Sequence, residues 1–61
     1  METYTVEQVA ELFRQEWLDS FSDSGYVWTK SKRKLDAALS VIDDDMRKAA
    51  FDMARAGWPN A

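Results

Sequence analysis

The sequence predicts an all-α fold, a small three-helix bundle formed by a single domain. Apolar residues recur at spacings of three and four along most of the chain, which is typical of amphipathic helices. Gly occurs only at positions 25 and 57 and Pro only at 59, so few residues interrupt a helix. With 61 residues, 46% of them hydrophobic, the chain is too short for two domains and too apolar for a disordered segment. The expected domain spans 1–61, with helices at about 6–20, 30–42 and 44–56.

The first helix is predicted to begin after Thr5. Thr5 is a favourable N-cap, and Gln8 three residues later completes a capping-box pattern. Six apolar residues then share one helical face and form the expected core side of this helix: Val6, Val9, Ala10, Phe13, Trp17 and Phe21. Leu12 and Leu18 fall on opposite flanks of that face.

A break is predicted over the segment SFSDSG at residues 20–25, because Ser, Asp and Gly offer the backbone local alternatives to a helix. Residues 26–28 (Tyr-Val-Trp) are expected to form an anchoring loop over the end of the core. Thr29 or Ser31 then caps the second helix, whose apolar face is Leu35, Ala38, Leu39 and Ile42. Four bases would occupy its first turn, which is the wrong sign for the positive end of the helix dipole.

Three consecutive Asp residues at 43–45 predict the start of the third helix, with one as N-cap and the others near the positive end of the dipole. Met46, Ala49, Ala50, Met53 and Ala54 follow at helical spacing. The helix is predicted to stop at Gly57 in a Schellman motif, with Trp58 reaching back to Met53 and Pro59 blocking continuation.

A second architecture is compatible with the same residues. Seven apolar residues recur at alternating spacings of four and three and form an unbroken heptad seam: Leu35, Leu39, Ile42, Met46, Ala49, Met53 and Ala56. One long helix over about 30–56 would then pair with the first helix as a hairpin. Such a hairpin cannot bury its seam alone and would dimerise into a four-helix bundle.

The composition argues against an enzyme. The chain has no His and no Cys, which removes the commonest general base and the commonest zinc ligands. It contains no phosphate-binding or nucleophile motif. Adjacent helical residues point in different directions, so residues 43–45 are interpreted as a helix start rather than a metal site. We therefore expect no catalytic residue, cofactor, metal or small-molecule substrate. An N-terminus without a basic or apolar leader predicts a cytoplasmic protein that does not enter the membrane.

A basic run, TKSKRK at 29–34, is the most distinctive feature. Residues 29–42 carry four bases and one acid, whereas both flanking segments are acidic and the whole chain has a net charge of −3. The bases are Lys30, Lys32, Arg33 and Lys34, and two aromatic residues, Tyr26 and Trp28, stand just before them. This pattern suits an acidic protein partner, or a nucleic acid held by stacking and phosphate contacts. The simpler interpretation is a solvated helix start whose charge balances the acidic first helix within the fold.

Three apolar residues do not fit the main faces of the predicted helices: Leu12, Leu18 and Phe51. In a domain this small, they could form an apolar patch together with Tyr26 and Trp28. Such a patch predicts a surface for a second copy of the chain or for a foreign protein. Burial on the broad side of each helix is the alternative.

The opening segment YTVEQVAELF, from Tyr4 to Phe13, resembles the first helix of excisionase and MerR-type winged helix-turn-helix domains. The following RQEWLDSFSDSG departs from their tight turn and recognition helix, so no family is assigned on this resemblance. The leading prediction is a small non-catalytic interaction protein, self-associating, that binds and modulates another macromolecule. Its size and class are those of accessory regulators carried by phages and mobile elements. The alternative is a small nucleic-acid-binding regulator that uses the basic run.

Overall fold

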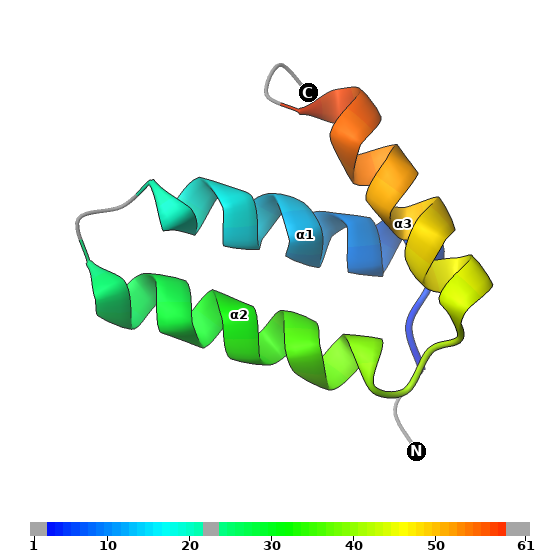
Figure 1. Cartoon of the computed structure of the whole chain (residues 1–61), viewed down its shortest axis with the longest axis horizontal. Coiled ribbons are helices and arrows are strands. Elements are labelled where there is room, and N and C mark those ends of the chain that lie inside the picture. The colour runs from blue at the N-terminus through cyan, green and yellow to red at the C-terminus, as the bar shows by residue number, and fades with distance from the viewer. Residues whose placement is uncertain (1–2, 22–23, 59–61) are drawn as a thin grey trace.

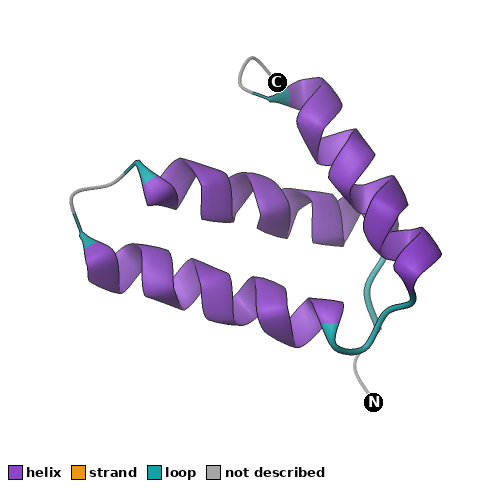
Figure 2. Ribbon diagram, viewed as in Figure 1, coloured by secondary structure: helices purple, strands orange, loops and turns teal. Residues whose placement is uncertain are grey.

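The computed structural model describes residues 3–21 and 24–58, and these form three helices (Figures 1 and 2). The helices are α1 (Val6–Ser20), α2 (Gly25–Leu39) and α3 (Asp44–Gly57). α1 and α2 run antiparallel side by side, and α3 crosses α1 obliquely (Figure 1). α1 packs against both other helices, whereas α2 and α3 hardly touch each other. The prediction of an all-α three-helix bundle is confirmed, and the Cα extents of 32 × 27 × 13 Å make it a flat one.

α1 has the predicted bounds because its start is encoded locally. The Thr5 hydroxyl accepts a hydrogen bond from the Gln8 N–H at 3.1 Å, and the Gln8 side-chain oxygen accepts one from the Thr5 N–H at 2.8 Å. This reciprocal arrangement is the predicted capping box.

α2 begins at Gly25, so the predicted start near residue 30 is wrong. Ser24 is the N-cap, and its hydroxyl accepts a hydrogen bond from the Val27 N–H at 3.4 Å. Residues 26–28 are therefore helical and do not form the expected anchoring loop. The earlier start also moves the basic residues out of the first turn, so the predicted conflict with the helix dipole does not arise.

The turn between α2 and α3 excludes the single long helix. α2 ends at Leu39 rather than at about 42, and the Ser40 hydroxyl donates back to the Ala37 carbonyl at 2.7 Å. Asp43 is the N-cap of α3, and its carboxylate accepts a hydrogen bond from the Met46 N–H at 2.8 Å. The heptad seam is therefore divided between two helices, and the hairpin with one long second helix is wrong.

α3 ends differently from the prediction. The helix includes Gly57, and the Trp58 N–H donates to the Arg55 carbonyl at 3.1 Å. The Trp58 ring contacts the rings of Trp17 and Phe21, and the expected contact with Met53 stays a prediction. The expected role of Pro59 lies outside the described residues.

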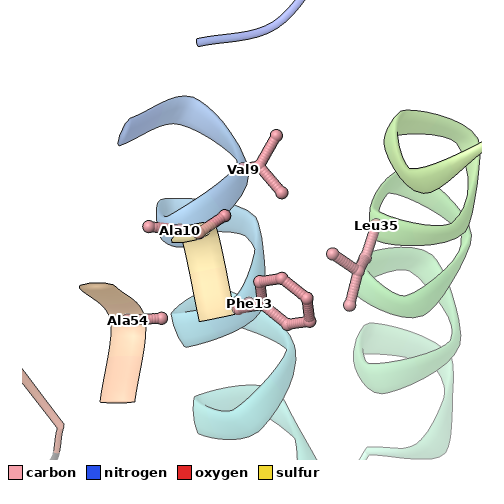
Figure 3. Close-up of a cluster of buried hydrophobic side chains, with 6 residues drawn as sticks. Val9, Ala10, Phe13, Leu35 and Ala54 are labelled. Carbon is pink, nitrogen blue, oxygen red and sulfur yellow. The ribbon is translucent and has the colours of Figure 1, made fainter. Parts of the chain in front are cut away.

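The core lies on both sides of α1 (Figure 3). Val9, Ala10 and Phe13 of α1 are buried with Leu35 of α2. On the other side they meet Ala50 and Ala54 of α3, which are fully buried. Alanine side chains let two helix axes approach closely, so α3 is held tightly against α1.

Candidate functional site

An apolar groove opens where the three helices meet. Its lining residues come from every helix: Phe13 from α1, Leu39 from α2, and Arg47, Lys48, Phe51 and Asp52 from α3. The groove has a volume of about 440 Å³. Phe13 is only 8% exposed and closes the floor, whereas Phe51 is 40% exposed at the side. The opening exists because α2 and α3 are both attached to α1 but not to each other.

A row of aromatic rings continues from this groove. The Phe51 ring meets Phe13 edge-on at a centroid distance of 5.5 Å, and it meets Trp17 edge-on at 5.6 Å. Trp17 contacts Trp58 at 5.9 Å, and Trp58 stacks on Phe21 at 6.2 Å. Phe13 and Trp17 are core-facing as predicted. Phe21, which was expected in the core, is 76% exposed because it caps the end of α1 beyond the last helical turn.

The rim of the groove carries more positive than negative charge. Arg47 pairs with Asp44 at 3.4 Å, but both side chains are exposed, so the pair is weak. Lys48 forms no ion pair with any residue in the described part of the chain. A carboxylate entering the groove would therefore meet a free ammonium group at its edge.

The four bases of the predicted run lie on α2, and all are exposed. They have no ion-pair partner in residues 3–21 or 24–58. Lys30, Arg33 and Lys34 share one face of α2, because residues three and four positions apart are neighbours on a helix, whereas Lys32 points away from them. Lys30 lies over the Tyr26 ring at 5.7 Å, and Lys32 lies over the Trp28 ring at 5.4 Å.

The two aromatic residues of α2 are separated in the same way. Tyr26 is 72% exposed and borders a second hollow, of about 410 Å³, together with Lys30 and Lys34. Trp28 is 38% exposed, and its indole N–H donates to Glu16 of α1 at 3.1 Å. The predicted stacking pair is therefore divided between two edges of α2.

The three apolar residues predicted outside the main faces do not form one patch. Leu12 packs against the core and is only partly exposed. Leu18 is 55% exposed and lies outside the groove lining. Phe51 alone belongs to the groove. Phe51 can reach Phe13 because Ala50 and Ala54 bring α3 close to α1, and this alanine pair at i, i+4 was the sequence signal for that approach.

Besides the contact of Trp28 with Glu16, two further polar contacts between helices were not foreseen from the sequence. The buried Ser31 hydroxyl of α2 donates to the Asp19 carboxylate of α1. The Arg14 guanidinium of α1 donates to the carbonyl oxygens of Met53 and Ala54, at 3.0 and 3.4 Å, near the end of α3. A cation suits this end of a helix, because its last carbonyls lack intrahelical donors. Ser31 lies on the same helical face as Leu35 and Ala38, and this spacing was the sequence signal for its burial.

Comparisons with protein-family models, with curated proteins and with solved structures found no significant match. No helix in the described residues is long and apolar enough to cross a membrane. The same residues contain no cluster of three or more acidic side chains placed to hold a metal ion. Asp43 instead caps α3, as the interpretation of residues 43–45 as a helix start required.

Proposed function

We propose that this chain is a small non-catalytic interaction protein of the cytoplasm that binds an acidic segment of another protein and thereby modulates it. The observation that carries the proposal is the apolar groove bounded by Phe13, Leu39 and Phe51 with free positive charge at its rim. Binding alone is sufficient for regulation when the bound segment is needed elsewhere. The assignment to accessory regulators of mobile elements rests only on size and fold class.

The groove defines the apolar part of the partner. Its volume of about 440 Å³ accommodates one or two large side chains such as Leu, Phe or Trp. Aromatic and aliphatic anchors in such a pocket supply most of the binding energy of an interface. An amphipathic helix presents anchors of this kind at positions i and i+3 or i+4.

The charges define the polar part of the partner. Lys48 stands at the groove rim without an ion pair in the described residues, and α2 adds four more unpaired bases. In the groove lining, the two cations Arg47 and Lys48 outnumber the single acid, Asp52. They favour a segment whose anchors are flanked by Asp or Glu, and they would raise its rate of association by electrostatic steering.

The nucleic-acid alternative has less support. Stacking on bases uses ring faces, and one face of each ring is already occupied, by Lys30 over Tyr26 and by Lys32 over Trp28. The two rings also lie on different edges of α2. A mobility shift with a single-stranded oligonucleotide at about 50 and 200 mM salt separates the two functions. Tight oligonucleotide binding at the lower salt would support the alternative.

A peptide titration followed by amide chemical shifts tests the proposed function. The probe is a synthetic amphipathic helix with Leu and Trp on one face and Glu on the other, beside a matched peptide with Lys for Glu. We expect the acidic peptide to shift the amides around Leu39 and residues 47–52, and to bind about tenfold more tightly than the basic peptide. Equal binding of the two peptides, or no binding of the acidic one at about 1 mM, would contradict the proposal.

A matched pair of variants assigns the binding to the groove. F51A removes a groove side chain, whereas F21A removes an aromatic ring of the same size that is outside the groove lining. We expect F51A to weaken peptide binding by about tenfold and F21A to leave it unchanged. Thermal melts of both variants confirm that the comparison is made on folded protein.

A further inference from the structure

The outward side of α3 carries an alternating row of charges. α3 turns Ala50 and Ala54 toward α1, where both are fully buried. Away from α1, four exposed residues follow at spacings of three, four and three, which places them on one helical face: Asp45, Lys48, Asp52 and Arg55. Their charges read minus, plus, minus, plus along the helix.

This row of charges complements the same row on a second copy of α3 only when the two helices are antiparallel. When two copies of α3 lie antiparallel with their midpoints at residue 50, Asp45 faces Arg55 of the second copy and Lys48 faces its Asp52. A parallel pair in register would instead set each charge against its like. A surface that matches its own copy about a two-fold axis is what an isologous dimer requires.

The rest of the face permits close approach. Ala49 and Ala56 are exposed and small, so the backbones of two helices can come near each other there. Phe51 and Met53, which are 40% and 39% exposed, flank the row and add apolar area. The four charges make no ion pair of their own in the described part of the chain, although neighbours in the row are only one turn apart.

We propose that two copies of this chain associate through antiparallel pairing of their α3 helices about a two-fold axis near residue 50. This inference goes beyond the proposed function, because it names a second copy of the chain as partner. The dimer face overlaps the groove at Lys48, Phe51 and Asp52, and only the dimer requires that a mixture of opposite charge variants restores association. The face consists mainly of exposed charges, and exposed ion pairs contribute little each, so the dimer is weak and concentration-dependent.

A charge-exchange experiment tests the pairing directly. K48E leaves residues 48 and 52 both negative, and D52K leaves both positive, so either variant alone should repel its own copy. In an equimolar mixture, the two negative residues of K48E, at positions 48 and 52, would face the two positive residues of D52K, at positions 52 and 48. We expect each variant alone to dimerise at least about tenfold more weakly than the native chain, and the mixture to form a heterodimer of native strength or better.

The mixture excludes effects within one chain. Repulsion between residues 48 and 52 in the same helix is present in each variant alone and persists in the mixture, so it cannot restore association. Sedimentation equilibrium from about 5 μM to 1 mM gives the masses, and circular dichroism confirms folding. A native chain that is monomeric throughout, variants that dimerise like the native chain, or a mixture that stays monomeric would each overturn the pairing.

Discussion

The two junctions that α1 makes with its neighbours differ in chemistry. The junction with α3 is formed by alanines in close contact and by a row of edge-on aromatic rings. The junction with α2 buries Leu35 and has two side-chain hydrogen bonds, Ser31 to Asp19 and Trp28 to Glu16. The junction with α3 also has hydrogen bonds, but these run from the Arg14 guanidinium to backbone carbonyls, whereas those of the junction with α2 join two side chains.

This difference explains where the free surface of the molecule lies. Because α2 and α3 are attached separately to opposite sides of α1, the groove remains open between them. The carboxylates that bind α2 belong to α1, so the bases of α2 are not used in holding the fold together. The fold thus leaves four exposed bases on α2, which contributes Leu39 to the lining of the apolar groove.

The largest expected effect comes from the residue that serves both junctions. Phe13 contacts Phe51 of α3 and is buried with Leu35 of α2. We expect F13A to cost about 3–5 kcal/mol, which is as much as a core of this size supplies, so the variant unfolds. F21A removes a ring that is 76% exposed and should cost less than about 1 kcal/mol. Similar thermal melts for the two variants would show that the core is not centred on Phe13.

The next effect tests the close contact between α1 and α3. Ala54 is fully buried in that junction, so A54L should push the helices apart and destabilise the chain by about 1–3 kcal/mol. A37L places the same larger side chain on the exposed side of α2 and should change stability by no more than about 0.5 kcal/mol. Urea unfolding measures both. If A54L were as stable as A37L, the alanine contact would not determine where α3 lies.

A smaller effect is expected from the cation at the end of α3. Arg14 donates to two carbonyl oxygens of α3, and its side chain is only 27% exposed. R14Q should cost about 1–2 kcal/mol, and the loss should appear as faster amide hydrogen exchange in the last turn of α3. Exchange that accelerates equally in α2 would indicate a general loss of stability instead.

The smallest stability effect is expected at the polar contact with α2. S31A removes the hydroxyl that donates to Asp19 and should cost about 0.5–1.5 kcal/mol. Because α3 is held independently, hydrogen exchange should increase in α2 and not in α3. S40A removes an exposed hydroxyl that bonds only within its own turn and is the matched control.

The parts of the fold that were predictable are those encoded within a few residues. The capping box at Thr5 and the Asp43 cap both lie within four residues of the groups they bind. The start of α2 was missed because the segment SDSG is compatible with a turn and also supplies the Ser24 cap. Arg14 bonds to residues 39 and 40 positions further along the chain, and Ser31 bonds to a residue 12 positions before it. Such contacts depend on how the helices cross, which no local pattern specifies.

The candidate site was only partly predictable for the same reason. The bases of α2 were visible in the sequence, and their exposure follows from their positions on the helix. The groove was not visible, because its lining combines residues from three helices. Phe51 was noticed only as a residue outside the main face, and the structure gives it a place among Phe13 and Trp17.

The most direct test of the proposed binding is its salt dependence, measured with the acidic amphipathic peptide. The native chain is compared with a variant in which four bases are replaced by Gln: Lys30, Lys32, Arg33 and Lys34. We predict that the variant has native stability to within about 0.5 kcal/mol, still binds in the groove, and associates more slowly with a flatter salt dependence. An unchanged salt dependence would show that the four bases of α2 do not steer the peptide. Loss of all shifts around Phe51 in a folded variant would show that the groove does not bind the peptide independently of those bases.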